Sequence, residues 1–300
     1  MPKRVLVTGS SGMIGSALCK VLSDRAYSIR TLSRSKEALS EGVFYWNPLT
    51  GELDPSALEG VDAIVHLAGE SISQRWTPSA REAILNSRVL GTRTLVEAMK
   101  ASDCRADLIT SSGINFYGCD VGYLEEGGQG SGTGFLSEVC RKWETEAQCL
   151  KNNGNRLVVL RTGVVLNRKG GALARLLPAF QFGLGGRVGS GEQWMSWIEL
   201  SDLVEIIIWA IEGDYEGSLN AVSPNPVTNR AFVNTLGLVL KKPTFFPLPS
   251  WVVQLIFGRM GEETVLADIG VLPEVLKQAG FRWQCPEIRS ALIESLEKDA

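Results

Sequence analysis

The sequence predicts an α/β protein, built on a doubly wound parallel sheet with a smaller C-terminal lobe. Over the first 166 residues, short apolar or β-branched runs alternate with helical patterns, which is typical of a mostly parallel sheet with helices on both faces. After Leu166, glycines and aromatic residues crowd the chain as far as Trp197, and prolines cluster between residues 243 and 249. These observations predict one large unit and one smaller unit.

The individual elements follow from local patterns. Each expected strand is a short apolar or β-branched run, and each expected helix repeats its apolar residues at helical spacing. We expect strands at Arg4–Thr8, Ser28–Leu32, Val43–Trp46, Ala63–His66, Leu108–Thr110 and Leu157–Leu160. We expect helices at Ile14–Asp24, Pro78–Lys100, Phe135–Lys151 and Leu203–Glu212, the last capped by Ser201 or Asp202. Residues 1–166, joined by 201–222, are expected to form a Rossmann-type domain, and residues 167–200 and 223–300 the substrate lobe.

Three glycines mark the end of the first strand. Gly9, Gly12 and Gly15 stand directly after the strand and directly before a helix, a spacing that lays a dinucleotide pyrophosphate on the helix N-terminus. Gly9 permits the tight turn, Gly12 lets the backbone approach the phosphates, and Gly15 lets the helix pack closely on the sheet. The alternative is a sharp turn without a ligand. The other turn residues expected to contact the cofactor are Ser11, Met13 and Ile14.

The end of the second strand indicates which cofactor binds. Sites that prefer NAD usually place Asp or Glu about 20 residues beyond the glycines, to hold the ribose 2′-hydroxyl. This chain has Ser33 and Arg34 there instead, and an arginine suits the 2′-phosphate of NADP. We therefore expect NADP; the alternative is that Arg34 is a solvated arginine at a strand end.

The fourth strand ends in His66-Leu67-Ala68-Gly69-Glu70. Because small residues let the backbone pass close to the cofactor, Leu67, Ala68 and Gly69 are expected cofactor contacts. His66 is interpreted as a core residue with satisfied hydrogen bonds. Glu70 is either a substrate contact or the acidic residue of a helix start.

Composition excludes several classes of function. A net charge of −3 gives no general attraction for nucleic acid. The single histidine excludes a histidine-rich metal site and argues against a Ser-His-Asp triad, so no metal is expected. Six cysteines without a CxxC pair, and an N-terminus without a signal-peptide pattern, predict a cytoplasmic protein. The run Trp251–Phe257 is interpreted as a core helix, with membrane contact as the alternative; no stable membrane insertion is expected.

Two sets of motifs carry a family resemblance. The first set is Thr8-Gly-Ser-Ser-Gly-Met-Ile-Gly15, Leu67-Ala-Gly69, Val89-Leu-Gly-Thr92, Thr110-Ser-Ser112 and Tyr117-Gly118. It resembles the short-chain dehydrogenase/reductase superfamily, in its extended, epimerase-like branch. The second set is Ser87-Arg88-Val89, Phe135-Leu136, Trp143-Glu144, Arg161-Thr-Gly163, Gly189-Ser-Gly191, Trp197-Ile198 and Asp202, with Pro247-Leu-Pro249, Phe257-Gly258 and Gly280-Phe281 near the C-terminus. It is similar to the atypical group called "epimerase family" proteins, which carry a short C-terminal domain of unknown function.

The resemblance implies two further cofactor contacts and an assembly. Arg88 stands where extended members usually carry Asn, so it is placed to reach the cofactor phosphates or ribose; the alternative is an arginine that caps a neighbouring carboxylate. Val164 stands where relatives contact the nicotinamide side through the backbone. Relatives often dimerise through the two long helices, which makes a homodimer the candidate assembly.

The catalytic residues of the superfamily are only partly present. Members that transfer hydride use a Tyr-x-x-x-Lys pair, in which the lysine lowers the tyrosine pKa. No such pair occurs in this chain, and its expected positions hold Phe135 and Val139. Ser112 is the expected partner of a substrate oxygen, with Ser111 as the alternative. Tyr117 is the candidate proton donor, although a buried packing tyrosine is the simpler interpretation.

Substrate contacts are expected from both units, and two functions stay open. Besides Glu70, we expect Gln193 and Trp194 to contact the substrate, and Trp197 could line the same pocket; the alternative is that both tryptophans are core residues of the lobe. Glu125 and Glu126 either cover the site or form a solvated acidic turn. One function is an NADP-dependent oxidoreductase or epimerase-like enzyme that acts on an unknown small molecule. The other is a non-catalytic NADP-binding sensor or regulatory protein. The pocket that a lobe would close favours the enzyme.

Overall fold

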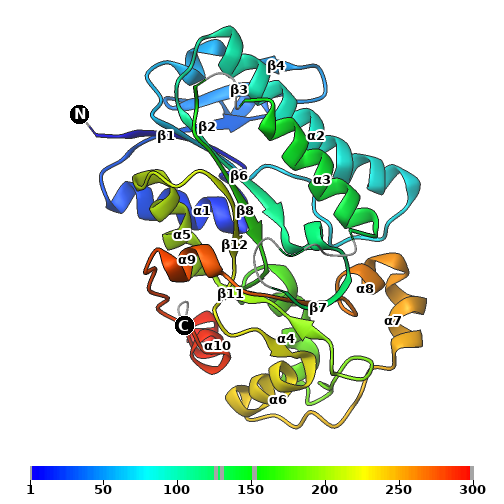
Figure 1. Ribbon diagram of the computed structural model, residues 1–300. Coiled ribbons are helices and arrows are strands. Elements are labelled where there is room, and N and C mark those ends of the chain that lie inside the picture. Colours follow the sequence, from blue (N-terminus) through cyan, green and yellow to red (C-terminus); the bar gives the residue numbers. More distant parts are fainter. Residues whose placement is uncertain (1, 125–127, 129–131, 151–153, 298–300) are drawn as a thin grey trace.

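The computed structural model describes residues 2–124, 128, 132–150 and 154–297, arranged around two main sheets (Figure 1). The larger sheet contains β1 (Arg4–Thr8), β2 (Ser28–Ser33), β3 (Val43–Asn47), β4 (Glu52–Leu53), β5 (Ala63–His66), β6 (Asp107–Gly113), β8 (Leu157–Thr162) and β12 (Gly217–Ala221). Their order across the sheet is β12-β8-β6-β5-β1-β2-β3-β4. Neighbouring strands run parallel except at the β3–β4 edge. This is the doubly wound α/β fold that the sequence predicts.

Helices cover both faces of the larger sheet, because its strands are apolar on both sides. In β1, Val5 and Val7 point into the core beneath α1 (Met13–Asp24) and α5 (Leu200–Glu212), whereas Leu6 points into the core beneath α2 (Pro78–Ala101) and α3 (Phe135–Gln148). The alternation follows from the two-residue period of a strand. The short α9 (Glu274–Gln278) adds Leu276 to the first of these cores.

The smaller unit is built on short strands from distant parts of the chain. A four-stranded sheet has the order β13 (Val227–Thr228), β10 (Trp194–Met195), β14 (Asp268–Val271) and β7 (Asp120–Leu124), and β9 (Val164–Leu166) pairs with β11 (Trp197–Glu199). The surrounding helices are α4 (Gly171–Gln181), α6 (Asn229–Leu240), α7 (Ser250–Phe257), α8 (Arg259–Glu263) and α10 (Ile288–Glu297). Trp197, fully buried, lies in the core between α4, α6 and α10. Three single-turn 3₁₀ helices are η1 (Lys36–Ala38), η2 (Pro55–Leu58) and η3 (Ile114–Tyr117).

Two expectations about the helices are wrong. α5 begins at Leu200 and its N-cap is Glu199, whose carboxylate accepts a hydrogen bond from the Ser201 N–H at 2.6 Å. The Asp202 carboxylate cannot serve as the cap, because it accepts the backbone N–H groups of residues 284 and 285 at 2.7 and 2.9 Å. The helix expected at Trp251–Phe257 is present as α7, but it is not a core helix: of its residues only Val253 is buried.

Candidate functional site

The turn between β1 and α1 leaves the N-terminus of α1 open. Gly9 has φ +69°, and a Cβ atom there would lie 2.9 Å from the Ala68 nitrogen. A Cβ atom on Gly15 would lie 2.2 Å from the Gly9 carbonyl oxygen, so neither position accepts a side chain. Gly12 is the N-cap of α1 and offers no side-chain cap, and the first turn of the helix has no acidic residue. The free N–H groups of this turn therefore form a site suited to an anion.

Thr8, which the sequence analysis did not single out, holds the neighbouring loop in place. Its buried hydroxyl oxygen accepts the N–H groups of Leu67 and Ala68, both at 3.1 Å, and lies 2.7 Å from Nδ1 of His66. Because both lone pairs of the hydroxyl are used, its proton goes to Nδ1, and Nε2–H is left to donate to Thr92 at 3.1 Å. The sequence signal for this role of Thr8 is a polar residue at the end of an apolar strand, directly before a glycine.

His66 is the core residue that the sequence predicts. It is fully buried and both ring nitrogens have partners. Burial, with a smaller contribution from the charge of Arg88, lowers the pKa of His66 to about 4. The ring is therefore neutral near pH 7 and acts as a spacer between β1, β5 and α2.

Arg88 lies beneath the loop that follows β5. Its Nη1 donates to the carbonyl oxygens of Glu70 at 2.9 Å and Ile84 at 3.1 Å, and its guanidinium carbon lies 5.2 Å from the centroid of the Trp143 ring. Among the described residues it has no ion pair, so it does not cap a carboxylate. A Cβ atom on Gly69 would lie 3.0 Å from the Arg88 guanidinium carbon, which explains the glycine at that position.

The end of β2 presents an exposed cation. Ser33 closes a local turn, since its hydroxyl accepts the N–H of Ser35 at 3.1 Å. Arg34 follows with its side chain in solvent and without an ion pair in the described part of the chain. It stands at the carboxyl edge of the sheet, on the strand next to β1.

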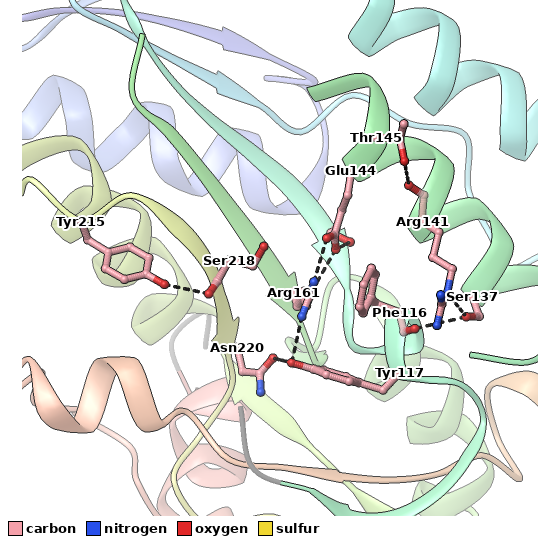
Figure 2. Close-up of polar contacts among 11 residues, drawn as sticks. Phe116, Tyr117, Ser137, Arg141, Glu144, Thr145, Arg161, Tyr215, Ser218 and Asn220 are labelled. Atoms are coloured by element: carbon pink, nitrogen blue, oxygen red, sulfur yellow. Dashed lines mark hydrogen bonds and ion pairs between the residues drawn. The ribbon is translucent and has the colours of Figure 1, made fainter. Parts of the chain in front are cut away.

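Ser112 and Tyr117 both belong to a buried polar network that joins the five elements β6, α3, η3, β8 and β12. Figure 2 shows Tyr117 with its partners Arg161 and Asn220. The Ser112 hydroxyl on β6 donates to the Glu144 carboxylate on α3 at 2.7 Å. Arg161 on β8 donates to both oxygens of the same carboxylate, at 3.0 and 2.9 Å, and to the Tyr117 hydroxyl at 3.1 Å. The Tyr117 hydroxyl in turn donates to Asn220 on β12 at 2.9 Å.

This network contains a buried ion pair with two engaged hydroxyls. The side chains of Glu144 and Arg161 are 3% and 13% exposed, and Tyr117 is 2% exposed. Arg161 also stacks on Phe116, with 3.5 Å from its guanidinium carbon to the ring centroid. The two hydroxyl residues could be predicted as site residues from the sequence, whereas the pairing of Glu144 with Arg161 could not. Their presence in two neighbouring family motifs was the only sequence signal.

The start of α3 holds apolar residues where a Tyr-x-x-x-Lys pair would place its polar groups. Phe135 and Val139 are both buried. The backbone N–H groups of Phe135 and Leu136 donate to the two carboxylate oxygens of Glu263, at 3.0 and 2.9 Å. A buried side chain of α8 thus caps α3 and fixes the C-terminal lobe against the larger unit.

Each of the remaining predicted site residues has its own local surroundings. Glu70 is half-buried and accepts a hydrogen bond from Gln74 at 3.3 Å, while the Gln193 amide donates to the Val188 carbonyl at 3.1 Å. Trp194 is half-buried and meets Tyr123 edge-on, with ring centroids 5.4 Å apart. Met13 and Ile14 are half-buried at the start of α1, and Ser11 before them is exposed. Val164 on β9 pairs with Trp197 on β11, and Ser111 is half-buried on β6. Glu125 and Glu126 lie outside the described residues.

Among the described residues, no group of three or more His, Cys, Asp or Glu side chains is arranged to hold a metal ion. None of the described helices combines the length and the apolarity needed to cross a membrane.

Comparison with known proteins gives matches over nearly the whole chain. The model of the NAD dependent epimerase/dehydratase family matches residues 5–221, and a domain of unknown function, DUF1731, matches residues 248–294. The epimerase family protein MT2273 of Mycobacterium tuberculosis is 39% identical over 290 residues, 96% of each chain. Human epimerase family protein SDR39U1 is 37% identical over 297 residues, 97% of this chain and 99% of that one. The crystal structure of human SDR39U1 with NADPH superimposes with a TM-score of 0.86 at 34% identity, covering 98% of this chain and 99% of that one.

Proposed function

Because the chain belongs to the NAD dependent epimerase/dehydratase family, we propose that it is an NADP-dependent oxidoreductase or epimerase-like enzyme of the extended short-chain dehydrogenase type. The observation that carries the proposal is the open N-terminus of α1. Gly12 caps this helix without a side chain, and no acid in the first turn competes for the N–H groups, so the pyrophosphate of a dinucleotide fits there. The NADPH bound by the human relative supports the same cofactor.

Two arginines decide the form of the cofactor in this proposal. Arg34, exposed at the end of β2, pairs with the 2′-phosphate of NADP. Arg88 uses only Nη1 for the carbonyls of Glu70 and Ile84, so the donors on Nε and Nη2 remain for the ribose or phosphates. The other residues assigned to the cofactor are Gly9, Ser11, Gly12, Met13, Ile14, Gly15, Ser33, Leu67, Ala68, Gly69 and Val164.

In this proposal the chain's own residues bind the substrate and transfer a proton beside the cofactor. Bound NADPH would supply a hydride, and bound NADP⁺ would accept one. The Ser112 hydroxyl, whose proton goes to Glu144, has lone pairs left to accept a hydrogen bond from a substrate hydroxyl. Tyr117 exchanges the proton, and Arg161 provides the adjacent positive charge that the absent lysine would provide. Glu70, Gln193 and Trp194 complete the substrate site.

A second candidate function is a non-catalytic NADP-binding sensor or regulatory protein. Phe135 and Val139 are apolar and buried, and the hydroxyls of Ser112 and Tyr117 already have partners in the interior. These observations favour a protein that binds the cofactor without turnover. Oxidation of bound NADPH on addition of a carbonyl or sugar-nucleotide substrate, lost in Ser112→Ala, would decide for the enzyme.

The proposal is tested by titrating the purified protein with NADPH and with NADH. We expect NADPH to bind more tightly than NADH, because only NADPH carries the phosphate that Arg34 pairs with. Arg34→Ala removes a charge-assisted contact of about 1.5–3 kcal/mol, so the NADPH Kd rises by roughly ten- to a hundredfold while the NADH Kd stays within about twofold. Isothermal titration calorimetry measures both.

Arg289→Ala is the matched control, since Arg289 is also exposed and has no ion pair among the described residues. It leaves both affinities unchanged. Equal losses for NADPH and NADH in Arg34→Ala would remove the 2′-phosphate role. Failure of the wild-type protein to bind either dinucleotide would refute the proposed function.

A further inference from the structure

The C-terminal lobe exposes large hydrophobic side chains along two segments, residues 182–191 and 238–260. We call these two segments the apolar-cationic face. Its exposed side chains are Phe182, Leu184, Leu238, Phe245, Phe246, Trp251, Leu255 and Ile256, each between 57% and 81% exposed. Elsewhere in the described residues, only Leu39, Leu49 and Tyr123 are large hydrophobics exposed in this way. Such a concentration on one lobe marks an interaction surface.

The two segments lie side by side where residues 186–189 pair with residues 245–248. A β-bridge joins Gly186 to Phe245, the Leu248 N–H donates to the Arg187 carbonyl at 2.8 Å, and the Gly189 N–H donates to the Leu248 carbonyl at 2.9 Å. α7 begins at Ser250, directly after this ladder. Figure 1 shows the chain between α6 and α7 running along the outer edge of the lobe.

The face carries positive charge and no negative charge. Neither segment contains an Asp or a Glu, although the whole chain has 33 acidic residues in 300. Its cations Arg187, Lys241, Lys242 and Arg259 are all exposed and form no ion pair among the described residues. In a chain with a net charge of −3, this local excess of positive charge gives the face an attraction for anions.

A cationic cleft borders the same face. It has a volume of about 210 Å³ and lies between the loop after β5 and the α7–α8 junction. Arg75, Arg81 and Arg259 line it together with Trp76, and no acidic residue does. None of the three arginines has an ion pair within the described ranges. The guanidinium carbon of Arg81 lies 4.4 Å from the centroid of the Phe135 ring. Guanidinium groups gathered in this way suit phosphate oxygens.

We propose that the apolar-cationic face docks on the surface of an anionic phospholipid bilayer. Trp251, Leu255 and Ile256 enter the boundary between headgroups and acyl chains, where aromatic and aliphatic side chains are stabilised. The lysines and arginines around them contact the negatively charged headgroups, and the cleft receives a headgroup phosphate. The contact is peripheral and leaves the lobe outside the hydrocarbon.

Other occupants fit the face less well. In a symmetric dimer the same patch meets itself, so the four cations of one copy would face those of the other without an acid between them. A specific protein partner needs about one hydrogen bond per 100–200 Å² of interface. The face offers few polar side chains for this purpose, chiefly Ser190, Thr244, Ser250 and Gln254.

Sedimentation with lipid vesicles tests the proposal. We expect the full-length protein to bind vesicles that contain about 30% phosphatidylglycerol in phosphatidylcholine, and not vesicles of phosphatidylcholine alone. Binding should weaken between low and high salt, because the cations lie in solvent. The double variant Leu255→Ser/Ile256→Ser should reduce partitioning at least about tenfold, and Lys241→Gln/Lys242→Gln by roughly fivefold per charge.

Two substitutions outside the face serve as matched controls. Leu49→Ser removes a leucine that is 73% exposed between β3 and β4, and Lys20→Gln removes an exposed lysine of α1; both should bind vesicles as the wild type does. Circular dichroism and thermal unfolding check that every variant is folded. Absence of wild-type binding to anionic vesicles, or binding unchanged in the face variants, overturns the proposal. So does a face-dependent dimer in light scattering without vesicle binding.

Discussion

His66 shows how the surroundings of one residue fix its charge. Its pKa is lowered from 6.5 to about 4 in the folded protein, whereas the unfolded chain protonates near the ordinary value. Above pH 6.5 the ring is mostly neutral in both the folded and the unfolded state, so it contributes little to the pH dependence of stability. As the pH falls from 6.5 toward 4, the unfolded state binds the proton first, and stability on the order of 3 kcal/mol is lost.

We expect the Cε1–H resonance of this single histidine to stay constant between pH 8 and 5 in the folded protein. Proton NMR of untagged protein follows it directly, because no other histidine is present. A titration midpoint near 6.5 would contradict the buried, neutral ring. Denaturant unfolding at pH 7 and pH 5 should show the matching loss of stability.

The Glu144–Arg161 pair is the most sensitive ionic contact in the candidate site. Glu144→Gln leaves the Arg161 guanidinium buried without its carboxylate, which destabilises the fold by about 3 kcal/mol. Urea unfolding measures the change. Glu138→Gln on the same helix is the control, because its pair with Lys142 is half exposed and should change stability by less than about 0.5 kcal/mol. Similar small effects in both variants would show that the Glu144 pair is not buried in solution.

Residue identities were easier to predict than residue partners. His66 could be interpreted as a core residue because it ends an apolar strand. Ser112 could be connected to a strand end, yet its partner Glu144 is 32 positions away on a helix. The packing of α3 against β6 brings these two residues together. No local pattern in a single sequence shows which face of a helix contacts which strand.

Among the elements, α3 depends on a cap from outside its own segment. Its N-cap is Gly134, which offers no side chain, and the Glu263 carboxylate supplies both hydrogen bonds instead. Glu263→Ala should cost about 1–2 kcal/mol and should accelerate amide hydrogen exchange at Phe135 and Leu136. Glu262→Ala, the exposed neighbour, is the control and should change neither. Unaltered exchange in Glu263→Ala would show that solvent caps the helix equally well.

The long helices could be located from the sequence, whereas the cap of α5 and the exposure of α7 could not. α2 begins at the expected Pro78, because Thr77 and a proline in the first turn are local signals. The predicted cap of α5 was wrong, because the Asp202 carboxylate instead accepts a backbone N–H from a residue more than 80 positions later. α7 was wrong as a core helix, since an apolar composition alone does not tell whether anything covers the helix.

For the whole molecule, the alternation of strands and helices predicted the large sheet, and each of its six expected strands is present. The four-stranded sheet of the lobe was not predicted. Its strands are two to five residues long and come from residues 120, 194, 227 and 268 onward. The two-residue strands β10 and β13 are too short to carry a periodicity, so only the folded chain shows that they join this sheet.

The order of strands in space has a consequence for synthesis of the protein. β7 pairs with β14, which lies at residues 268–271. The free edge of β8 is covered only by β12, at residues 217–221. A ribosome releases the chain from the N-terminus, so β7 and β8 emerge long before their partners and leave strand edges open meanwhile. The smaller sheet cannot be completed on a nascent chain before residue 271 has been translated, and the larger sheet cannot be completed before residue 221 has been translated. Until these partner segments have been made, the open edges of β7 and β8 can pair with other strands.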